Sequence, residues 1–314
     1  MSGVLPVIVI AGPTASGKSA AALAVAEAFG GVVINADSMQ IYHGLRVLTA
    51  APDDAAMARV PHLLYGVLDP AERCSAGRWL GMAQYAIAQS RAEGRLPIVV
   101  GGTGLYLSAL LRGLAPVAPV PPEIERAAEV LLAELGADAF RERLRRFDPA
   151  AAARIEDPAR LVRAYAVYQA TGRALSAWQD DHVPAPAVPG PIGGLALVPP
   201  RASLYAAIDG RFARMFEEGA LEDVKALAAR GLDPRVPAMK ALGVAELLAF
   251  LRGEIDRDGA CRLAQAKSRR YAKRQLTWLR HQLSELETWN EQYSESLNER
   301  IFAFIRQFVL TGPH

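Results

Sequence analysis

The stretch GPTASGKS at residues 12–19 restricts the fold of this chain more than any other feature. It follows the apolar run VIVI and precedes the alanine-rich stretch AAALAVAEAF, so it fits the pattern GxxxxGK[ST] in the strand-loop-helix setting that the pattern requires. Glycines let backbone N–H groups turn inward, the next helix adds its positive end, and side chains add a cation and a hydroxyl that can hold Mg²⁺. The sequence therefore predicts a diphosphate or triphosphate site, rather than a plain turn, formed by Gly12, Pro13, Thr14, Ala15, Ser16, Gly17, Lys18 and Ser19, with Ser19 as the Mg²⁺ ligand.

Composition excludes several other classes. With 314 residues, 51% hydrophobic and 22% charged, the chain has the length and balance of a soluble globular protein with one large domain or two smaller ones. It has no run of about 18 apolar residues and no secretory pattern at its start, so we expect a cytoplasmic protein that does not contact a membrane. Cys74 and Cys261 lack metal spacing and are expected to be buried thiols, and His43 and His62 to be hydrogen-bonded structural residues.

Three apolar runs predict a parallel α/β core. PVIVIAG, GVVINAD and LPIVVGG read as buried strands, and helical stretches separate them. In such cores, ligands bind beyond the carboxyl ends of the strands. The phosphate loop, the segment NADSMQIY and the segment GGTGLY should therefore meet at one edge of the sheet.

A helical segment interrupts this core. Proline-rich GLAPVAPVPPE precedes residues 123–180, which are charged and helical, and VPAPAVPGP follows them. IGGLALVPP then reads as one more strand, and the pattern from residue 201 onward is helical to near the end. We predict a P-loop NTPase-like parallel sheet core flanked by helices, at residues 1–117 and 191–314, with a helical insertion domain at residues 118–190.

The segment CRLAQAKSRRYAKRQLTWLRHQ at residues 261–282 contains seven Lys or Arg residues and no acid. At about 100° per residue the seven cations fall within an arc of roughly 160°, opposite an apolar face. The stripe is either a solvated face or a surface for a polyanion. Because like charges at this spacing repel one another without a partner, we favour nucleic acid phosphate.

Together these motifs resemble the tRNA dimethylallyltransferases, also called tRNA isopentenyltransferases. GPTASGKS, ADSMQIY, GGTGLY, DPARLVRA with TGR, and YAKRQLTW occur in that family's order and approximate spacing, from residue 7 to about 282. The resemblance implies transfer of a prenyl group from dimethylallyl diphosphate to the exocyclic amine of the adenine immediately 3′ of the tRNA anticodon. It implies that the phosphate loop holds the donor diphosphate with Mg²⁺, that the partner is a tRNA anticodon stem-loop, and that no nucleotide is hydrolysed. We expect a monomer.

The resemblance also assigns roles at the site. Asp37 is expected to be the general base, although an acid at this place can also bind Mg²⁺ or cap a helix. Thr103 is expected beside the donor and the target base, where its hydroxyl can bond the phosphate or the amine; the alternative is a turn residue. Lys18 neutralises the leaving diphosphate, and Arg211 is carried over as a further diphosphate contact.

The family's tRNA-contacting segments map onto four stretches and Thr103. The residues concerned are Asp37, Ser38, Met39, Gln40, Thr103, Ala159, Arg160, Leu161, Val162, Arg163, Lys240, Ala241, Leu242, Gly243, Val244, Ala245, Lys273, Arg274, Gln275, Leu276, Thr277, Trp278, Leu279 and Arg280. The chain departs from the family pattern at a few neighbouring places, namely Leu48, Ala51, Ala207, Val244 and Ser268. These departures bear on affinity and tRNA choice more than on the class of reaction.

Two alternatives belong to other functional classes. A P-loop kinase, or an adenylate prenyltransferase acting on a free nucleotide, would use the core but give the basic segment no role. A non-catalytic RNA-binding ATPase would use the phosphate loop and the basic segment but give GGTGLY no role. The tRNA prenyltransferase accounts for all of these motifs.

Overall fold

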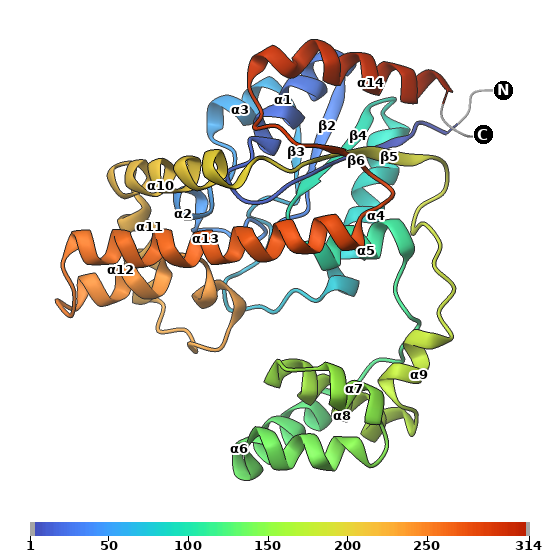
Figure 1. The fold of residues 1–314 in the computed structure, drawn as a ribbon, viewed down its shortest axis with the longest axis vertical. Helices are drawn as coiled ribbons and strands as arrows, with labels where there is room; N and C mark the ends of the chain where they lie inside the picture. The colour runs from blue at the N-terminus through green and yellow to red at the C-terminus, as the bar shows by residue number, and fades with distance from the viewer. Residues whose placement is uncertain (1–3, 312–314) are drawn as a thin grey trace. The chain divides into compact units, whose positions relative to one another are not determined.

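A six-stranded parallel sheet forms the centre of the larger of two compact units (Figure 1). The computed structural model describes residues 4–311, and this unit comprises the described chain up to Arg112 together with that from Pro186 onward. The strand order is β3-β2-β4-β1-β5-β6, and each neighbouring pair is parallel, which confirms the predicted α/β core. The strands are Val7–Ala11 (β1), Gly31–Asn35 (β2), His62–Leu63 (β3), Leu96–Gly101 (β4), Ile192–Leu197 (β5) and Glu287–Trp289 (β6).

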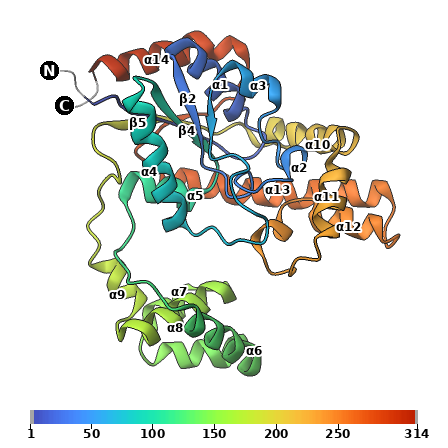
Figure 2. The ribbon, with the colours of Figure 1, turned by 180° about the vertical axis from the view of Figure 1, so that it is seen from behind.

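Helices cover both faces of the sheet, which is why its central strands are apolar throughout. Along β1, Ile8 and Ile10 face one hydrophobic cluster, whereas Val7 and Val9 face another. The first cluster includes side chains of α1 (Lys18–Phe29) and α14 (Asn298–Thr311). The second includes side chains of α4 (Ala76–Ala92), α5 (Gly104–Arg112), α10 (Arg201–Glu217) and α13 (Arg257–Gln282). Figures 1 and 2 show these two groups of helices on opposite sides of the sheet.

The first half of this unit carries the crossover helices. Asp53 and Ser75 cap two of them, because each side chain accepts a hydrogen bond from a backbone N–H in the first turn, at 2.8 Å and 3.1 Å. The helices are Lys18–Phe29 (α1), Arg46–Thr49 (α2), Asp54–Arg59 (α3), Ala76–Ala92 (α4) and Gly104–Arg112 (α5).

The C-terminal part is helical, as predicted, except for β6. This three-residue strand pairs with β5, and Val198 donates its N–H to the Trp289 carbonyl at 2.8 Å. The α-helices are Arg201–Glu217 (α10), Ala220–Ala229 (α11), Val244–Leu251 (α12), Arg257–Gln282 (α13) and Asn298–Thr311 (α14), and 3₁₀ turns span Pro237–Lys240 and Glu295–Leu297.

The smaller unit, residues 113–185, consists of helices without a strand. Phe140, Leu144 and Leu161 lie in its core and are fully buried. The buried carboxylate of Asp148 accepts hydrogen bonds from the N–H groups of Ala151 and Ser176 at 2.9 Å and 3.1 Å, so it joins two of the helices. The helices are Pro122–Arg145 (α6, with a break at Gly136), Pro149–Arg154 (α7), Pro158–Thr171 (α8) and Leu175–Asp180 (α9).

The isolated cysteines and histidines have the following surroundings. Cys74 and Cys261 are free thiols, but both are partly exposed rather than buried. His62 has its Nδ1 2.9 Å from the Val60 carbonyl, and His43 lies 3.5 Å from a carboxylate. Within residues 4–311, no three His, Cys, Asp or Glu side chains group as a metal cluster, and no helix has the length and apolar character to cross a membrane.

Candidate functional site

The phosphate loop connects β1 to α1 through backbone that only small residues permit. Ala15 and Gly17 have φ angles of 65° and 85°, in the left-handed region. A Cβ on Gly17 would lie 2.6 Å from the Cβ of Tyr293, and one on Gly12 would lie 2.5 Å from the hydroxyl of Ser16. No side chain caps α1 and no acid lies in its first turn, so its N–H groups and positive end remain available to an anion.

Two recessed cations lie beside this loop. The Lys18 Nζ donates to the Pro13 carbonyl at 3.2 Å, and an Arg211 Nη donates to the Thr14 hydroxyl at 2.5 Å. Burial lowers the pKa of Lys18 from 10.5 to about 8, an effect that Asp37 opposes and Arg211 adds to. Burial likewise lowers the pKa of Arg211 to about 10. An anion bound between these two side chains would favour their charged forms and so raise their pKa values again.

Asp37 lies just after the end of β2, and hydrogen bonds fix its orientation. Its N–H donates to the buried side chain of Asn35 at 2.7 Å, and the Asn35 amide donates to the Asp37 carbonyl at 3.0 Å. One Asp37 carboxylate oxygen accepts the Met39 N–H at 2.9 Å. A turn rather than a helix follows, so the helix-cap alternative is wrong. The carboxylate lines the same pocket as Lys18 and Arg211.

Thr103 links this segment to the GGTG loop, residues 101–104, which connects β4 to α5. Its hydroxyl accepts the Ser38 N–H at 2.9 Å, and its own N–H donates to the Ala36 carbonyl at 3.3 Å. The Tyr271 hydroxyl from α13 lies near Thr103, and burial, with the nearby Asp37, raises the pKa of Tyr271. Thr103 is therefore more than a turn residue, because it ties residues 36–39, which we call the base segment after the role expected of Asp37, to the edge of the sheet.

The glycines of the GGTG loop admit close neighbours. A Cβ on Gly101 would lie 2.2 Å from the carbonyl oxygen of Ala36, and a Cβ on Gly104 would lie 2.4 Å from the ring of Trp278. Each distance is shorter than real Cβ contacts. The backbone of the base segment and the indole of α13 can approach only because these side chains are missing.

We expect Gly101→Ala to lower the free energy of unfolding by about 3 kcal/mol, because the neighbouring carbonyl cannot move aside without breaking the sheet edge. Urea denaturation measures this change. Gly81→Ala in α4 is the matched control: its Cβ would meet nothing within 4 Å, so the helix should gain about 0.5 to 1 kcal/mol. Equal stabilities for the two variants would show that the close approach at Gly101 is not a constraint.

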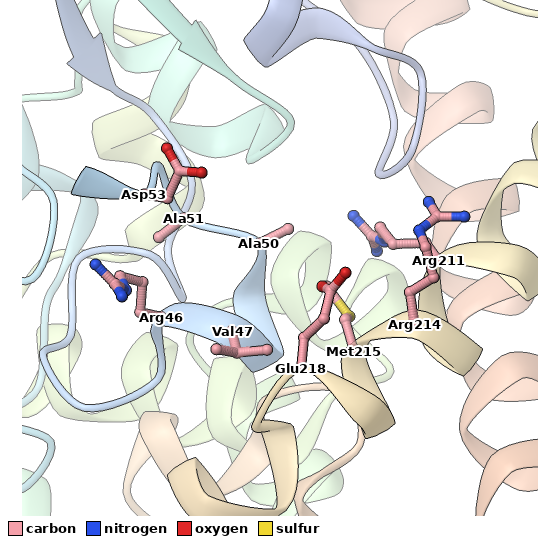
Figure 3. Close-up of a pocket in the computed structure, with 9 residues that line it drawn as sticks. All are labelled: Arg46, Val47, Ala50, Ala51, Asp53, Arg211, Arg214, Met215 and Glu218. Atoms are coloured by element: carbon pink, nitrogen blue, oxygen red, sulfur yellow. The ribbon is translucent and has the colours of Figure 1, made fainter. Parts of the chain in front are cut away.

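The pocket at this edge has a volume of about 260 Å³. A second hollow of about 280 Å³ shares Ala50, Arg211 and Arg214 with it, and Figure 3 shows the two arginines of α10 facing Ala50 across that hollow. Gln40 donates to the carbonyls of Thr49 and Ala50 at 2.9 Å and 3.0 Å. These bonds fix the backbone of Thr49 and Ala50, which line the first pocket. The first pocket is lined by Thr14, Ala15, Gly17, Lys18, Ser19, Asp37, Gln40, Thr49, Ala50, Ala207, Arg211, Arg214 and Gln292.

The basic helix, α13, exposes most of its predicted cationic stripe. Two of the seven cations at residues 261–282 have acidic partners within the chain, since Lys267 pairs with Glu246 and Arg269 pairs with Asp209. The expectation of an uncompensated stripe is therefore wrong for these two, whose partners come from α12 and α10. The cations that remain exposed, with no ion-pair partner among residues 4–311, are Arg262, Arg270, Lys273, Arg274 and Arg280.

Burial narrows the predicted tRNA contacts. The side chains that are withdrawn from the surface are Leu161, Val162, Ala241, Val244, Gln275, Leu276 and Leu279; Gly243 is also enclosed, against Leu48 and Phe212. These residues pack the fold in the described structure. Those with exposed side chains are Ala159, Arg160, Lys240, Ala245, Lys273, Arg274, Thr277 and Arg280, and those that are half-buried are Asp37, Ser38, Met39, Gln40, Thr103, Arg163, Leu242 and Trp278. Both of these groups remain the predicted contacts.

The sequence did not predict several residues that contribute to the site. Arg214 lines both hollows, Gln292 donates to the Ala15 carbonyl at 2.9 Å, and Tyr293 packs on Gly17. Tyr271 lies on α13, and its hydroxyl lies near Thr103. No local pattern marks Gln292 or Tyr293, because their partners lie near the other end of the chain.

Comparisons with known proteins agree with this geometry. The model of the IPP transferase family matches residues 40–282, and that of the isopentenyl transferase family matches residues 5–64. The chain is 52% identical to the tRNA dimethylallyltransferase of Rhodospirillum rubrum, over 99% of this chain and 97% of that protein. It is 54% identical to that of Rhodospirillum centenum, over 90% of this chain and 91% of that protein.

Solved structures give the same result. The full-length tRNA isopentenylpyrophosphate transferase of Bacillus halodurans is 30% identical, with a TM-score of 0.69 over 97% of each chain. A eukaryotic dimethylallyltransferase, solved acting on tRNA, is 26% identical, with a TM-score of 0.84 over 98% of this chain and 80% of that one. These relatives favour the prenyltransferase over the free-nucleotide enzyme and the RNA-binding ATPase. The chain belongs to the tRNA dimethylallyltransferase family.

Proposed function

We propose that the chain transfers a dimethylallyl group from dimethylallyl diphosphate to the exocyclic amine of the adenine immediately 3′ of the tRNA anticodon, and releases diphosphate. Family membership makes it a tRNA dimethylallyltransferase. The observation that carries the mechanism is the single pocket in which the carboxylate of Asp37 faces the cations Lys18 and Arg211. A base for the adenine amine and a site for the leaving diphosphate of the donor are thus within the same pocket.

The leaving group is stabilised by fixed positive charge. As the allylic C–O bond breaks, the diphosphate departs with the electron pair, so negative charge grows beside the phosphate loop. Lys18, Arg211 and the uncapped N-terminus of α1 meet this charge without having to reorganise. Arg214 lines the same pocket and adds a further positive charge.

The carboxylate of Asp37 takes the proton that the amine must lose. The adenine amine is a poor nucleophile because its lone pair is delocalised into the ring, so removal of the proton as the N–C bond forms assists the reaction. The Met39 N–H donates to this carboxylate, and the hydrogen bonds between the Asn35 side chain and the Asp37 backbone fix the segment that carries it. Thr103, anchored by Ser38, positions the amine and the donor relative to this base.

The oxygen donors in the pocket fit Mg²⁺. Ser19 in the first turn of α1 and Asp37 both line it, and Mg²⁺ is usually held by one or two protein oxygens together with phosphate oxygens and water. When bound, Mg²⁺ would neutralise part of the diphosphate charge. Asp37 cannot serve fully as both ligand and base, so we assign the ligand role to Ser19.

The tRNA is bound by the exposed cations of α13 and must present an extruded base. A base stacked in the anticodon loop cannot reach a pocket of this kind, so the enzyme flips it out at a cost of a few kcal/mol. Arg270, Lys273, Arg274 and Arg280 offer phosphate contacts that help to offset this cost. We propose that the helical unit at residues 113–185 contributes Arg160 and Arg163, and that one monomer acts on one tRNA.

Changing both Lys273 and Arg274 to Ala should weaken tRNA binding about equally for different cognate tRNAs and leave binding of dimethylallyl diphosphate alone unchanged. Removing one phosphate contact reduces the slope of log affinity against log salt by roughly 0.7 to 0.9, so the slope of the double variant should be smaller by about 1.5. Binding isotherms at several salt concentrations measure the slope.

Arg306→Ala is the control for this variant. Arg306 is an exposed cation of α14, which lies on the other side of the sheet from α13 (Figure 1), so its removal should leave the slope unchanged. An unchanged slope and affinity in the Lys273 and Arg274 double variant would mean that the stripe is a solvated face, and would remove the basic helix from the tRNA site.

A further inference from the structure

Gln275 of the basic helix bridges two loops of the active site. Its side-chain oxygen accepts the N–H of Thr14 in the phosphate loop at 2.9 Å, and its side-chain nitrogen donates to the Gly102 carbonyl in the GGTG loop at 2.8 Å. The residue is 5% exposed. It also occupies the space that a side chain on Gly102 would need, since a Cβ there would lie 2.4 Å from the Gln275 nitrogen.

The Gln275 side chain is too buried to contact tRNA directly. Its neighbours Lys273 and Arg274 are exposed, whereas Gln275 is buried against the two loops and has both polar atoms occupied. The bonds to Thr14 and Gly102 engage its side-chain oxygen as an acceptor and its side-chain nitrogen as a donor.

One of the two bridged loops lies at the site of the leaving diphosphate, and the other lies beside the proposed base. Thr14 also accepts a hydrogen bond from Arg211 of α10, so its loop lies against a cation that faces the leaving diphosphate. The GGTG loop carries Thr103, which binds the Ser38 N–H next to Asp37. Between β1 and β4 the sheet sets the approximate spacing of these loops, and Gln275 adds a side-chain link beyond the ends of the strands.

We propose that Gln275 is a positioning residue that keeps the diphosphate loop and the base segment in register. This inference rests on the proposed function. Because in-line displacement requires the amine, the allylic carbon and the leaving oxygen to be aligned, a small shift between the two loops should slow the chemical step more than it weakens binding of either substrate.

The test is the single-turnover rate of Gln275→Met at saturating dimethylallyl diphosphate and tRNA, with equilibrium binding of each substrate measured separately. Methionine has a similar volume but neither hydrogen-bonding atom. We expect the rate to fall by about 10- to 100-fold, while the dissociation constants of tRNA and of the donor stay close to wild type. Gln275→Glu keeps the acceptor for Thr14 and should retain part of the rate.

Gln265→Met is the matched control. Gln265 lies on the same helix and donates to the Asp209 carbonyl at 3.0 Å, so the substitution also removes a partly buried glutamine hydrogen bond but touches neither loop. Its rate should equal that of the wild type. If Gln275→Met fails to fold, as judged by thermal unfolding, the test is the single-turnover rate of Gln275→Glu compared with that of Gln265→Met. A lower rate in Gln275→Glu supports the inference, and equal rates contradict it.

Two results would overturn the inference. A wild-type rate in the Gln275 variants would show that the bridge does not set the alignment, and weaker tRNA binding with an unchanged rate at saturation would make Gln275 a tRNA contact instead. Failure of the proposed function is a separate outcome, because the wild-type protein would then leave the tRNA unprenylated in the same assay.

Discussion

Asp37→Asn is expected to lower the single-turnover rate by about 10² to 10⁴-fold while tRNA and donor binding stay close to wild type. The amide keeps the shape of the side chain, and its oxygen can still accept the Met39 N–H, which the carboxylate accepts at 2.9 Å. It cannot take the proton of the adenine amine. Rapid-quench measurement with both substrates saturating isolates this step.

The dependence of the rate on Mg²⁺ concentration distinguishes the base role that we assign to Asp37 from the alternative role of a Mg²⁺ ligand. If it is the base, additional Mg²⁺ will not restore the rate of Asp37→Asn, whereas removal of a metal ligand would be compensated at high Mg²⁺. Asp233→Asn, at an exposed position outside both hollows, controls for the removal of one negative charge. A variant at Asp37 that turns over as fast as the wild type would exclude the base assignment.

Lys18→Ala is expected to weaken binding of dimethylallyl diphosphate and also to slow the chemical step by about 10²- to 10³-fold at saturating donor. The second effect arises because charge on the diphosphate grows as the C–O bond breaks, so the ammonium stabilises the transition state more than the bound donor. A single-turnover rate that is unchanged at saturation would restrict Lys18 to binding.

The lowered pKa of Lys18 gives this cation a pH signature. In the free enzyme its pKa is about 8, and a bound diphosphate favours the charged form, so the pKa is higher in the complex. Donor affinity should therefore be constant from neutrality to about pH 8 and fall as pH rises further, because binding then requires uptake of a proton. Titration calorimetry should show this bend in the wild type and not in Lys18→Ala.

Local patterns predicted the parts of the fold that depend on local chemistry. VIVIA, GVVIN and LPIVVG are buried on both faces, so their continuous apolar character indicated central strands before any pairing was known. β6 escaped prediction because its three residues, ETW, have two exposed side chains and depend on β5 for pairing. The phosphate loop was predictable from its glycines. The segments NADSMQIY and GGTGLY were predictable as neighbours of this loop because each directly follows an apolar strand.

Contacts between distant segments could not be predicted from spacing. The helical wheel placed the exposed cations of α13 correctly, yet it could not show that Asp209 and Glu246 would neutralise Arg269 and Lys267. The same holds for Gln275, whose partner Thr14 lies 261 residues away in the sequence. Motif order indicated which segments act together, whereas three-dimensional packing decides which side chains touch the ligand and which support the loops.

Mass analysis of the nucleosides from tRNA incubated with the protein and dimethylallyl diphosphate tests the central claim most directly. Fragments that include the anticodon loop locate the modified base, and a parallel reaction with free AMP tests the free-nucleotide alternative. The account predicts one dimethylallyl group on the adenine immediately 3′ of the anticodon, stoichiometric release of diphosphate and no product from AMP. Unmodified tRNA together with prenylated AMP would contradict it.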